Sequence, residues 1–252
     1  MPVTLDPSQI DQYRETGYYI VKGALTEADF EPIEIAYNEL IDQRARNFKE
    51  RELITDLCED EPFATRFARI AEQIDPEIGD IGRELTWGLD IMHAKLRPMF
   101  EFFFNPNLLA PVESIIGSEI LLSPIQHIRP YVPVSGDKQA MQVPWHQDQG
   151  VTKEDADVSE ILTVWIPLVD VNEENGAMRL LVGSHTKQET FRGPNVPPVL
   201  YPISSEVDQH MVSLNMKQGE AVLYDHALWH SSPENRTDKL RLAFVLGVGI
   251  CV

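Results

Sequence analysis

The sequence predicts a mainly β fold with flanking α-helices, in which a helical first half supports a barrel or sandwich of short strands. Helix signals dominate up to about residue 117, and short β-type runs follow from residue 118. The length of 252 residues suits one large domain. We therefore expect a single domain over 1–252, with 1–117 as mainly helical support and 118–252 as the β core.

The first half carries helix start and stop signals around one β-type run. Asp6, Pro7 and Gln9 have the pattern of an N-cap, a proline at the first helical position and a capping-box glutamine. Gly17 ends that helix, and Thr26 is placed to cap a longer one. The expected elements are a helix over 7–16, a strand over 18–22, a helix from 26 to about 46, mainly helical chain over 60–104 and a helix over 108–116.

The second half consists of short β-type runs separated by Pro, Gly and Asn, which is typical of a barrel or a sandwich. An acidic loop is expected over 153–160. The Pro- and Gly-rich connection over 191–205 is of the kind that often covers an active site. The expected strands are 120–122, 126–131, 162–167, 178–182, 221–224 and 242–248.

The charge balance excludes some classes of partner. The chain has 21 basic and 40 acidic residues, a net charge of −19, which opposes binding to nucleic acid or anionic lipid. No segment approaches the roughly 18 uninterrupted apolar residues of a membrane span. The first residues have neither a basic start nor an apolar signal core, so a cytoplasmic location is expected. The sequence does not predict an oligomeric state.

The cysteine content limits the kind of metal site that the chain can build. Cys58 and Cys251 are far apart in the sequence and too few for a disulfide framework or a cysteine metal site. Any bound metal must therefore use histidine and carboxylate ligands.

A possible metal site begins at His146 and Asp148. If this segment is extended, its two-residue period puts both side chains on the same face. His230 lies 84 residues further on (230 − 146), after the apolar run 219–224, and can supply a third ligand across a barrel. Two histidines and one carboxylate leave open positions on an iron(II) ion, a pattern that marks non-haem iron oxygenases.

Arg241 suggests an anionic co-substrate. It stands eleven residues after His230 (241 − 230), at the start of an apolar run. If its strand pairs beside the one that bears His230, the guanidinium can enter the same cavity, where its fork matches a carboxylate in a bidentate way.

Each pattern also has a plainer explanation. An HxD sequence alone is more often a surface turn or a hydrogen-bonded pair, and Arg241 could pair with a carboxylate at a barrel rim. His226 and His230 have a spacing that could hold zinc if it lay on a helix, but Ala227 stands where a metalloprotease motif has Glu.

Several stretches together resemble a known family. They are Trp-His-Gln-Asp at 145–148, Val-Trp-Ile-Pro-Leu-Val-Asp at 164–170, Asn-Gly-Ala-Met-Arg-Leu-Leu-Val-Gly-Ser-His at 175–185, and His-Ser-Ser-Pro-Glu-Asn at 230–235 with Arg241. The chain is similar here to the phytanoyl-CoA dioxygenase family of Fe(II)- and 2-oxoglutarate-dependent oxygenases. That resemblance covers nearly the whole chain and implies a double-stranded β-helix core, a jelly-roll of the cupin-like kind.

The resemblance also implies roles for individual residues. The iron ligands would be His146, Asp148 and His230. Arg241 would bind the distal carboxylate of 2-oxoglutarate, and Ser232 would add a hydroxyl contact to it. Residues expected near the co-substrate are Gln147, Thr163 and Trp165, and residues expected near the substrate are His127, Gln149, His226 and Trp229. Gln149 departs from many relatives, which carry an aromatic residue after the HxD.

The implied reaction consumes 2-oxoglutarate and O₂, hydroxylates an unactivated C–H bond of a small molecule or secondary metabolite, and releases succinate and CO₂. Asp148 favours hydroxylation over halogenation, because related halogenases replace this carboxylate with a small residue. The same chemistry leaves desaturation or ring formation open. Two functions of other classes also stay open: a metal-dependent hydrolase and a non-catalytic barrel that binds a small molecule.

Overall fold

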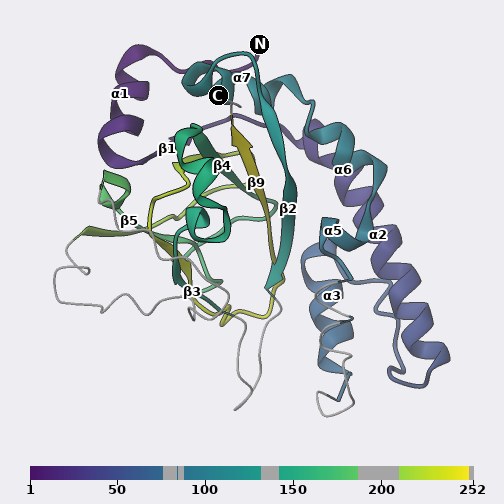
Figure 1. Cartoon of the computed structure of the whole chain (residues 1–252). Helices are drawn as coiled ribbons and strands as arrows, with labels where there is room; N and C mark the ends of the chain where they lie inside the picture. The colour runs from purple at the N-terminus through teal and green to yellow at the C-terminus, as the bar shows by residue number, and fades with distance from the viewer. Residues whose placement is uncertain (76–83, 85–87, 132–141, 187–209, 250–252) are drawn as a thin grey trace.

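Two antiparallel sheets form most of the second half of the chain (Figure 1), in a computed structural model that describes residues 1–75, 84, 88–131, 142–186 and 210–249. One sheet has the order β1-β7-β4-β9-β2 and the other has the order β3-β8-β5-β6. The strands are β1 (Tyr18–Val21), β2 (Leu121–Tyr131), β3 (Val143–His146), β4 (Ile161–Pro167), β5 (Arg179–Leu181), β6 (Met211–Ser213), β7 (Ala221–Asp225), β8 (His230–Ser232) and β9 (Arg241–Gly249). The mainly β prediction is confirmed.

Helices precede the sheets in the chain, apart from the strand β1. They are α1 (Pro7–Thr16), α2 (Glu27–Glu50), α3 (Phe63–Glu72), α5 (Ile91–Ala94), α6 (Arg97–Phe102) and α7 (Pro106–Ile116). The predicted caps of α1 are present: Asp6 Oδ1 accepts hydrogen bonds from the backbone N–H groups of Ser8 and Gln9, and Gly17 ends the helix at φ 85°. Helix α2 continues to Glu50, four residues beyond the expected end at Arg46 (50 − 46).

The strands differ from the prediction mainly where they are short or irregular. The separate runs expected at 120–122 and 126–131 form the single strand β2, whose register with β9 shifts between Leu122 and Gln126. Strands β3, β6 and β8 have three or four residues each. Runs this short carry too little periodicity to be recognised, and only the extended chain before His146 was anticipated.

The five-stranded sheet has two apolar faces with different partners. We call the face that packs against the helices the outer face; its core includes Phe244, which stacks on Phe102 of α6 with ring centroids 5.1 Å apart. The inner face turns toward the four-stranded sheet, and there Trp165 and Tyr224 share a second core with Leu180. Burial on both faces fixes the register of β4, β7 and β9, because a slip of one residue would exchange the two sets of side chains.

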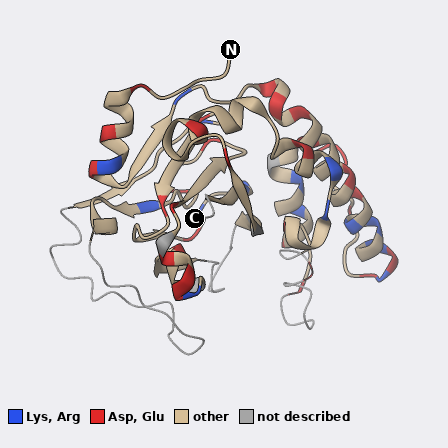
Figure 2. Cartoon of the chain, turned by 45° about the horizontal axis from the view of Figure 1, so that its top comes forward, with Lys and Arg blue, Asp and Glu red and all other residues tan. Residues whose placement is uncertain are grey.

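The helices α2, α3, α5 and α6 lie together on the side of the molecule next to β2 (Figure 1). Acidic residues are spread over the helices (Figure 2), in keeping with the net charge of −19. Among the described helices none combines the length and the apolar character needed to cross a membrane.

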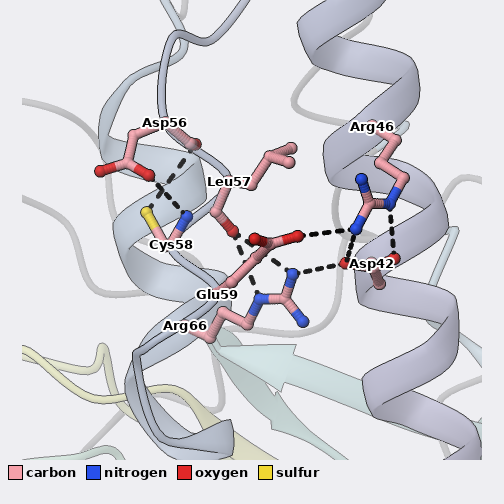
Figure 3. A network of polar contacts seen from close by, with 7 residues as sticks. All are labelled: Asp42, Arg46, Asp56, Leu57, Cys58, Glu59 and Arg66. Atoms are coloured by element: carbon pink, nitrogen blue, oxygen red, sulfur yellow. Dashed lines mark hydrogen bonds and ion pairs between the residues drawn. The ribbon is translucent and has the colours of Figure 1, made fainter.

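A polar network joins α2 to α3 and to the loop between them (Figure 3). Arg66 of α3 has only 9% of its side chain exposed and donates to Asp42 Oδ1 at 2.8 Å and to the Leu57 carbonyl at 3.3 Å. Asp42 also accepts from the exposed Arg46, which reaches Glu59 as well. Because Arg66 is nearly buried, its charge depends on these acceptors for compensation.

We predict that Arg66→Met lowers the free energy of unfolding by about 1–3 kcal/mol, since it leaves the Leu57 carbonyl without its Arg66 donors and Asp42 Oδ1 with only the longer bond from Arg46 at 3.4 Å. The matched change Arg46→Met removes an exposed partner of the same carboxylate and should cost less. Urea denaturation of both variants measures the difference. Equal losses would show that burial does not decide the strength of this contact.

The same network predicts a pH dependence. Hydrogen bonds from Arg46 and Arg66 hold the pKa of Asp42 below its ordinary value of 3.8. A carboxylate with a lowered pKa in the folded state adds stability above that ordinary value, and the contribution disappears as the pH falls through the lowered pKa. Asp42→Asn should therefore be less stable than the wild type at pH 7, and the gap should close in acid. A gap that stays constant down to pH 2 would contradict this.

Candidate metal centre

Three side chains that sequence reasoning selected lie together between the sheets. His146 ends β3, Asp148 opens the 3₁₀ turn that follows it, and His230 begins β8. Strands β3 and β8 pair with His146 opposite His230, so their rings lie 4.1 Å apart between centroids. The ligand atoms of all three residues lie within 4.8 Å of one another. Asp148 joins the group from a turn and not from the extended strand that the sequence suggested.

Both imidazoles are oriented by the backbone. His146 Nδ1 lies 2.9 Å from the Pro144 carbonyl and His230 Nδ1 lies 3.0 Å from the Leu228 carbonyl. A carbonyl can only accept, so each Nδ1 carries a proton and each Nε2 is the ring nitrogen that can ligate a metal. These Nε2 atoms lie 3.7 Å and 3.5 Å from Asp148 Oδ1. The arrangement is typical of histidines that ligate a metal.

Asp148 is held by two hydroxyl groups from the five-stranded sheet. Its Oδ2 accepts from Thr163 Oγ1 at 2.7 Å and from the Tyr224 hydroxyl at 3.0 Å, which leaves Oδ1 toward the histidines. Burial acts to raise the pKa of Asp148, but His230, His146 and the two hydroxyl donors together keep it below the ordinary value of 3.8. The carboxylate is thus ionised and able to ligate a cation.

Tyr224 is a site residue that sequence reasoning missed. Its hydroxyl also lies 3.4 Å from His230 Nε2. The sequence feature that could have identified Tyr224 is its position at the end of the run 221–224, six residues before His230 (230 − 224). A tyrosine in an apolar strand is usually counted with the core, where Tyr224 indeed packs.

Arg241 enters the interior from the opposite sheet, which corrects one expectation. Its strand β9 pairs with β4 and β2, whereas β8, which bears His230, pairs with β3 and β5. The two strands therefore face each other across the interior and do not lie side by side. Strand pairing depends on contacts distant in the sequence, so the eleven-residue spacing could not decide it.

The guanidinium of Arg241 is fully buried without a carboxylate partner in the described part of the chain. Its Nη2 donates to the Gly176 carbonyl at 2.8 Å, its carbon lies 3.6 Å from the centre of the Tyr131 ring, and its Nε has no hydrogen-bond partner there. Burial lowers the pKa of Arg241, while Tyr131 acts in the opposite direction. A buried cation of this kind is stable only with an anion or strong acceptors nearby.

Gly176 allows the close approach that positions Arg241. It has φ 85°, and a Cβ there would lie 2.7 Å from the Pro233 carbonyl oxygen. A side chain at 176 would therefore push this segment, whose carbonyl accepts from Arg241, away from Pro233.

The residues expected near the co-substrate take different positions. Trp165 lies on the inner face, 5.6 Å from the Arg241 guanidinium, and Thr163 bonds Asp148 directly. Ser232 is buried on β8, two residues beyond His230 and so on the same face of that strand. Gln147 is buried and donates to the Ala227 carbonyl at 2.7 Å, on the loop that leads to His230.

The four residues expected near the substrate are also spread around the centre. His127 Nδ1 lies 2.9 Å from Asp90 Oδ2 at the edge strand β2. Gln149 donates to Asp157, and Trp229 is buried in a small cluster with Leu181. Their roles stay predictions.

The zinc alternative based on His226 and His230 is wrong, because these residues do not lie on a helix. His226 stands in a turn with its Nδ1 2.8 Å from the Ile161 carbonyl, and His230 opens a strand. The connection 191–205, expected to cover the site, lies outside the described residues.

Comparison with known proteins identifies the family. The family model described as phytanoyl-CoA dioxygenase matches residues 13–243. A phytanoyl-CoA dioxygenase of Arabidopsis thaliana is 23% identical over 97% of this chain and 89% of its own length. The dioxygenase olcK of Penicillium canescens is 30% identical over 32% of this chain, and the match spans only 23% of that protein.

A solved structure supports the fold. The epimerase SnoN, in complex with Fe³⁺, α-ketoglutarate and nogalamycin RO, aligns with a TM-score of 0.62 at 18% identity, over 96% of this chain and 84% of that chain. The predicted resemblance is confirmed, and so, at the level of the family, is the enzyme class of 2-oxoglutarate-dependent dioxygenases. The chain belongs to the phytanoyl-CoA dioxygenase family.

Proposed function

We propose that the chain is a non-haem oxygenase in which His146, Asp148 and His230 hold Fe(II) and Arg241 binds 2-oxoglutarate. The observation that carries the proposal is the presence of a cluster of potential metal ligands and a buried cation in one interior. The cluster consists of two imidazole nitrogens and a carboxylate oxygen within 4.8 Å of one another, and the cation is a buried guanidinium without a carboxylate partner in the described chain. A divalent cation suits the first and an organic acid suits the second.

The two groups are connected along the inner face of β4. Thr163 bonds Asp148, Trp165 lies two residues further on the same face, and Arg241 lies beside Trp165. Two residues of a strand span about 7 Å, so a short dicarboxylate can reach from the metal ligands to the guanidinium. We assign Arg241 to its distal carboxylate and Ser232 to a hydroxyl contact with it.

When bound, iron and 2-oxoglutarate supply the activation of O₂, with succinate and CO₂ as the products of the co-substrate. The chain's residues orient and enclose these groups. The Pro144 and Leu228 carbonyls fix the imidazoles, and Thr163 and Tyr224 fix the carboxylate. The apolar core around Trp165 and Leu180 limits the access of water from that side.

We propose hydroxylation of a C–H bond of a small molecule as the reaction, within a double-stranded β-helix domain formed by the two sheets. Asp148 supports hydroxylation over halogenation because the carboxylate is retained. Desaturation and ring formation are the alternative outcomes of the same centre. A hydrolase using the same ligands on zinc is less well supported, since it would provide no co-substrate carboxylate for Arg241 to bind.

We propose the His127–Asp90 pair as a polar contact for the substrate. Asp90 has 14% and His127 28% of the side chain exposed, and both lie at the edge strand β2. A partly exposed imidazole with one nitrogen on a carboxylate can offer its other nitrogen to a ligand.

We predict that purified enzyme forms succinate from 2-oxoglutarate only when Fe(II) and O₂ are both present. Asp148→Ala should abolish this while the fold persists, because one of three metal ligands is lost. A succinate assay with a substrate panel, together with circular dichroism, measures both. Turnover without Fe(II), or retained turnover in Asp148→Ala with bound iron, would contradict the assignment.

Arg241→Ala should weaken 2-oxoglutarate binding by about tenfold or more, because it removes charge-assisted hydrogen bonds to a carboxylate. Arg241→Lys, which keeps the charge without the fork, should recover only part of the affinity. Anaerobic titration of the Fe(II) enzyme, followed by its visible charge-transfer band, measures this.

Arg179→Ala is the matched control for Arg241. Arg179 also has a buried Nε without a hydrogen-bond partner in the described chain, but it lies on β5 opposite Ser231. Unchanged affinity in Arg241→Ala, or an equal loss in Arg179→Ala, would remove the co-substrate role of Arg241.

Thr163→Val and Tyr224→Phe should each lower metal affinity by about 10–100-fold, since each removes a donor that orients the Asp148 carboxylate. Calorimetric titration with Co(II) in the absence of 2-oxoglutarate measures the effect. Tyr37→Phe is the control: its hydroxyl also makes a buried hydrogen bond, to the Leu89 carbonyl at 2.7 Å, remote from the metal ligands in sequence and fold. Normal metal affinity in both site variants would argue against a metal-positioning role.

A further inference from the structure

A second cavity lies on the other side of the five-stranded sheet from the metal ligands. It has a volume of about 510 Å³ and lies between the edge strand β2 and the helices α5 and α6, which are neighbours in Figure 1. Leu122 and Gln126 of β2 line it, opposite Val248 and Leu246 of β9, whose side chains belong to the outer core. Since paired residues of antiparallel strands share a face, the cavity opens on the outer face.

The cavity is built mainly from apolar side chains. Ile91, Met92, Leu96, Phe100, Phe103 and Leu122 supply most of its lining. Phe100 is 59% and Met92 39% exposed, so apolar surface remains open at the mouth. Small-molecule sites have volumes of about 300–1,000 Å³ with largely apolar walls, and exposed apolar patches often mark such sites.

One buried polar group in the wall lacks a partner. Gln126 is 5% exposed, and its Nε2 donates to the carbonyls of Ser123 and Gly247 at 2.6 Å and 3.1 Å. These two acceptors fix the orientation of the amide, and its Oε1 then has no donor in the described chain. An unsatisfied buried acceptor is costly, and a ligand N–H or O–H would relieve that cost.

The charged side chains of the lining are both cationic. Lys95 and Arg97 are exposed, and no acidic residue of the described chain lines the cavity, although the whole chain carries −19. Arg97 pairs with Glu101 at 2.7 Å, whereas Lys95 forms no ion pair with a described residue. Lys95 also has φ 47° at the end of α5, a position that favours glycine.

We propose that this cavity binds a small amphipathic anion, with its apolar body between α5, α6 and β2 and its anionic group at Lys95 and Arg97. The volume, the apolar lining, the free acceptor of Gln126 and the charge of the rim all fit that class of ligand. The site is separate from the metal centre, and it does not depend on the function proposed for that centre.

A pair of fluorescent probes tests the proposal on the full-length, metal-free protein. One is 8-anilinonaphthalene-1-sulfonate, and the other is N-phenyl-1-naphthylamine, which has the same apolar skeleton without the sulfonate. Both should bind saturably with one site per chain. Leu96→Trp, which fills the cavity, should abolish both signals, whereas Leu40→Trp, a partly buried leucine of α2 outside the lining, should leave them unchanged.

The charge of the rim is tested separately. Lys95→Glu should lower the affinity for the sulfonate probe by about fivefold and change the affinity for the neutral probe by less than about twofold. The reason is that only the sulfonate is repelled by the reversed charge. Lys49→Glu, at the end of α2, makes the same change of net charge away from the cavity and should affect neither probe.

Four results would overturn the proposal. Three of them are non-saturable binding, retained binding in a Leu96→Trp protein that thermal unfolding shows to be folded, and equal effects of Lys95→Glu and Lys49→Glu on binding of the sulfonate probe. Displacement of the probes by metal and 2-oxoglutarate would assign them to the metal centre and would also overturn it. Loss of oxygenase activity alone would leave this proposal standing, because the probes need neither metal nor turnover.

Discussion

The geometry of the metal centre depends on one carboxylate held between the two sheets. Asp148 follows β3 of the four-stranded sheet, but its Oδ2 is bound by Thr163 of β4 and Tyr224 of β7 in the other sheet. Three potential ligand atoms within 4.8 Å of one another keep that geometry only if hydrogen-bond partners or a cation hold them in place. The two hydroxyl donors and the two backbone carbonyls behind the imidazoles provide that support. The registers of β4, β7 and β8 are therefore constrained by chemistry as well as by packing.

Local signals were enough to predict some of this structure. The caps of α1 depend on Asp6, Gln9 and Gly17, which interact within a few residues of one another, and their geometry follows from sequence spacing alone. The candidate metal ligands were selected for a similar reason: the types and spacing of His146, Asp148 and His230 restrict the chemistry strongly. Their selection required no knowledge of the sheet order, whereas their approach to 3.5–3.7 Å depends on the pairing of β3 with β8.

Features that depend on distant pairing were not predictable in the same way. The pairing of β9 with β4 and β2 determines which sheet contains Arg241. Likewise, β2 is a single strand because β9 pairs with it on both sides of the register shift between Leu122 and Gln126. Tyr224 has the sequence context of a core residue, and its hydroxyl meets Asp148 and His230 only in the folded structure. These assignments come from the assembled sheets, because no single segment contains the information.

The pairing of β1 with β7 has a consequence for how the chain is made. Tyr18 lies opposite Tyr224, so the partner of this strand is 206 residues further along (224 − 18). A ribosome releases the N-terminal segment long before β7 is synthesised, and β1 must remain unpaired until the residues of β7 have emerged. The five-stranded sheet, and with it the strand that bears Tyr224, is completed only after β9 has been synthesised as well. Nascent chains stalled before residue 221 would therefore expose an open sheet edge to chaperones.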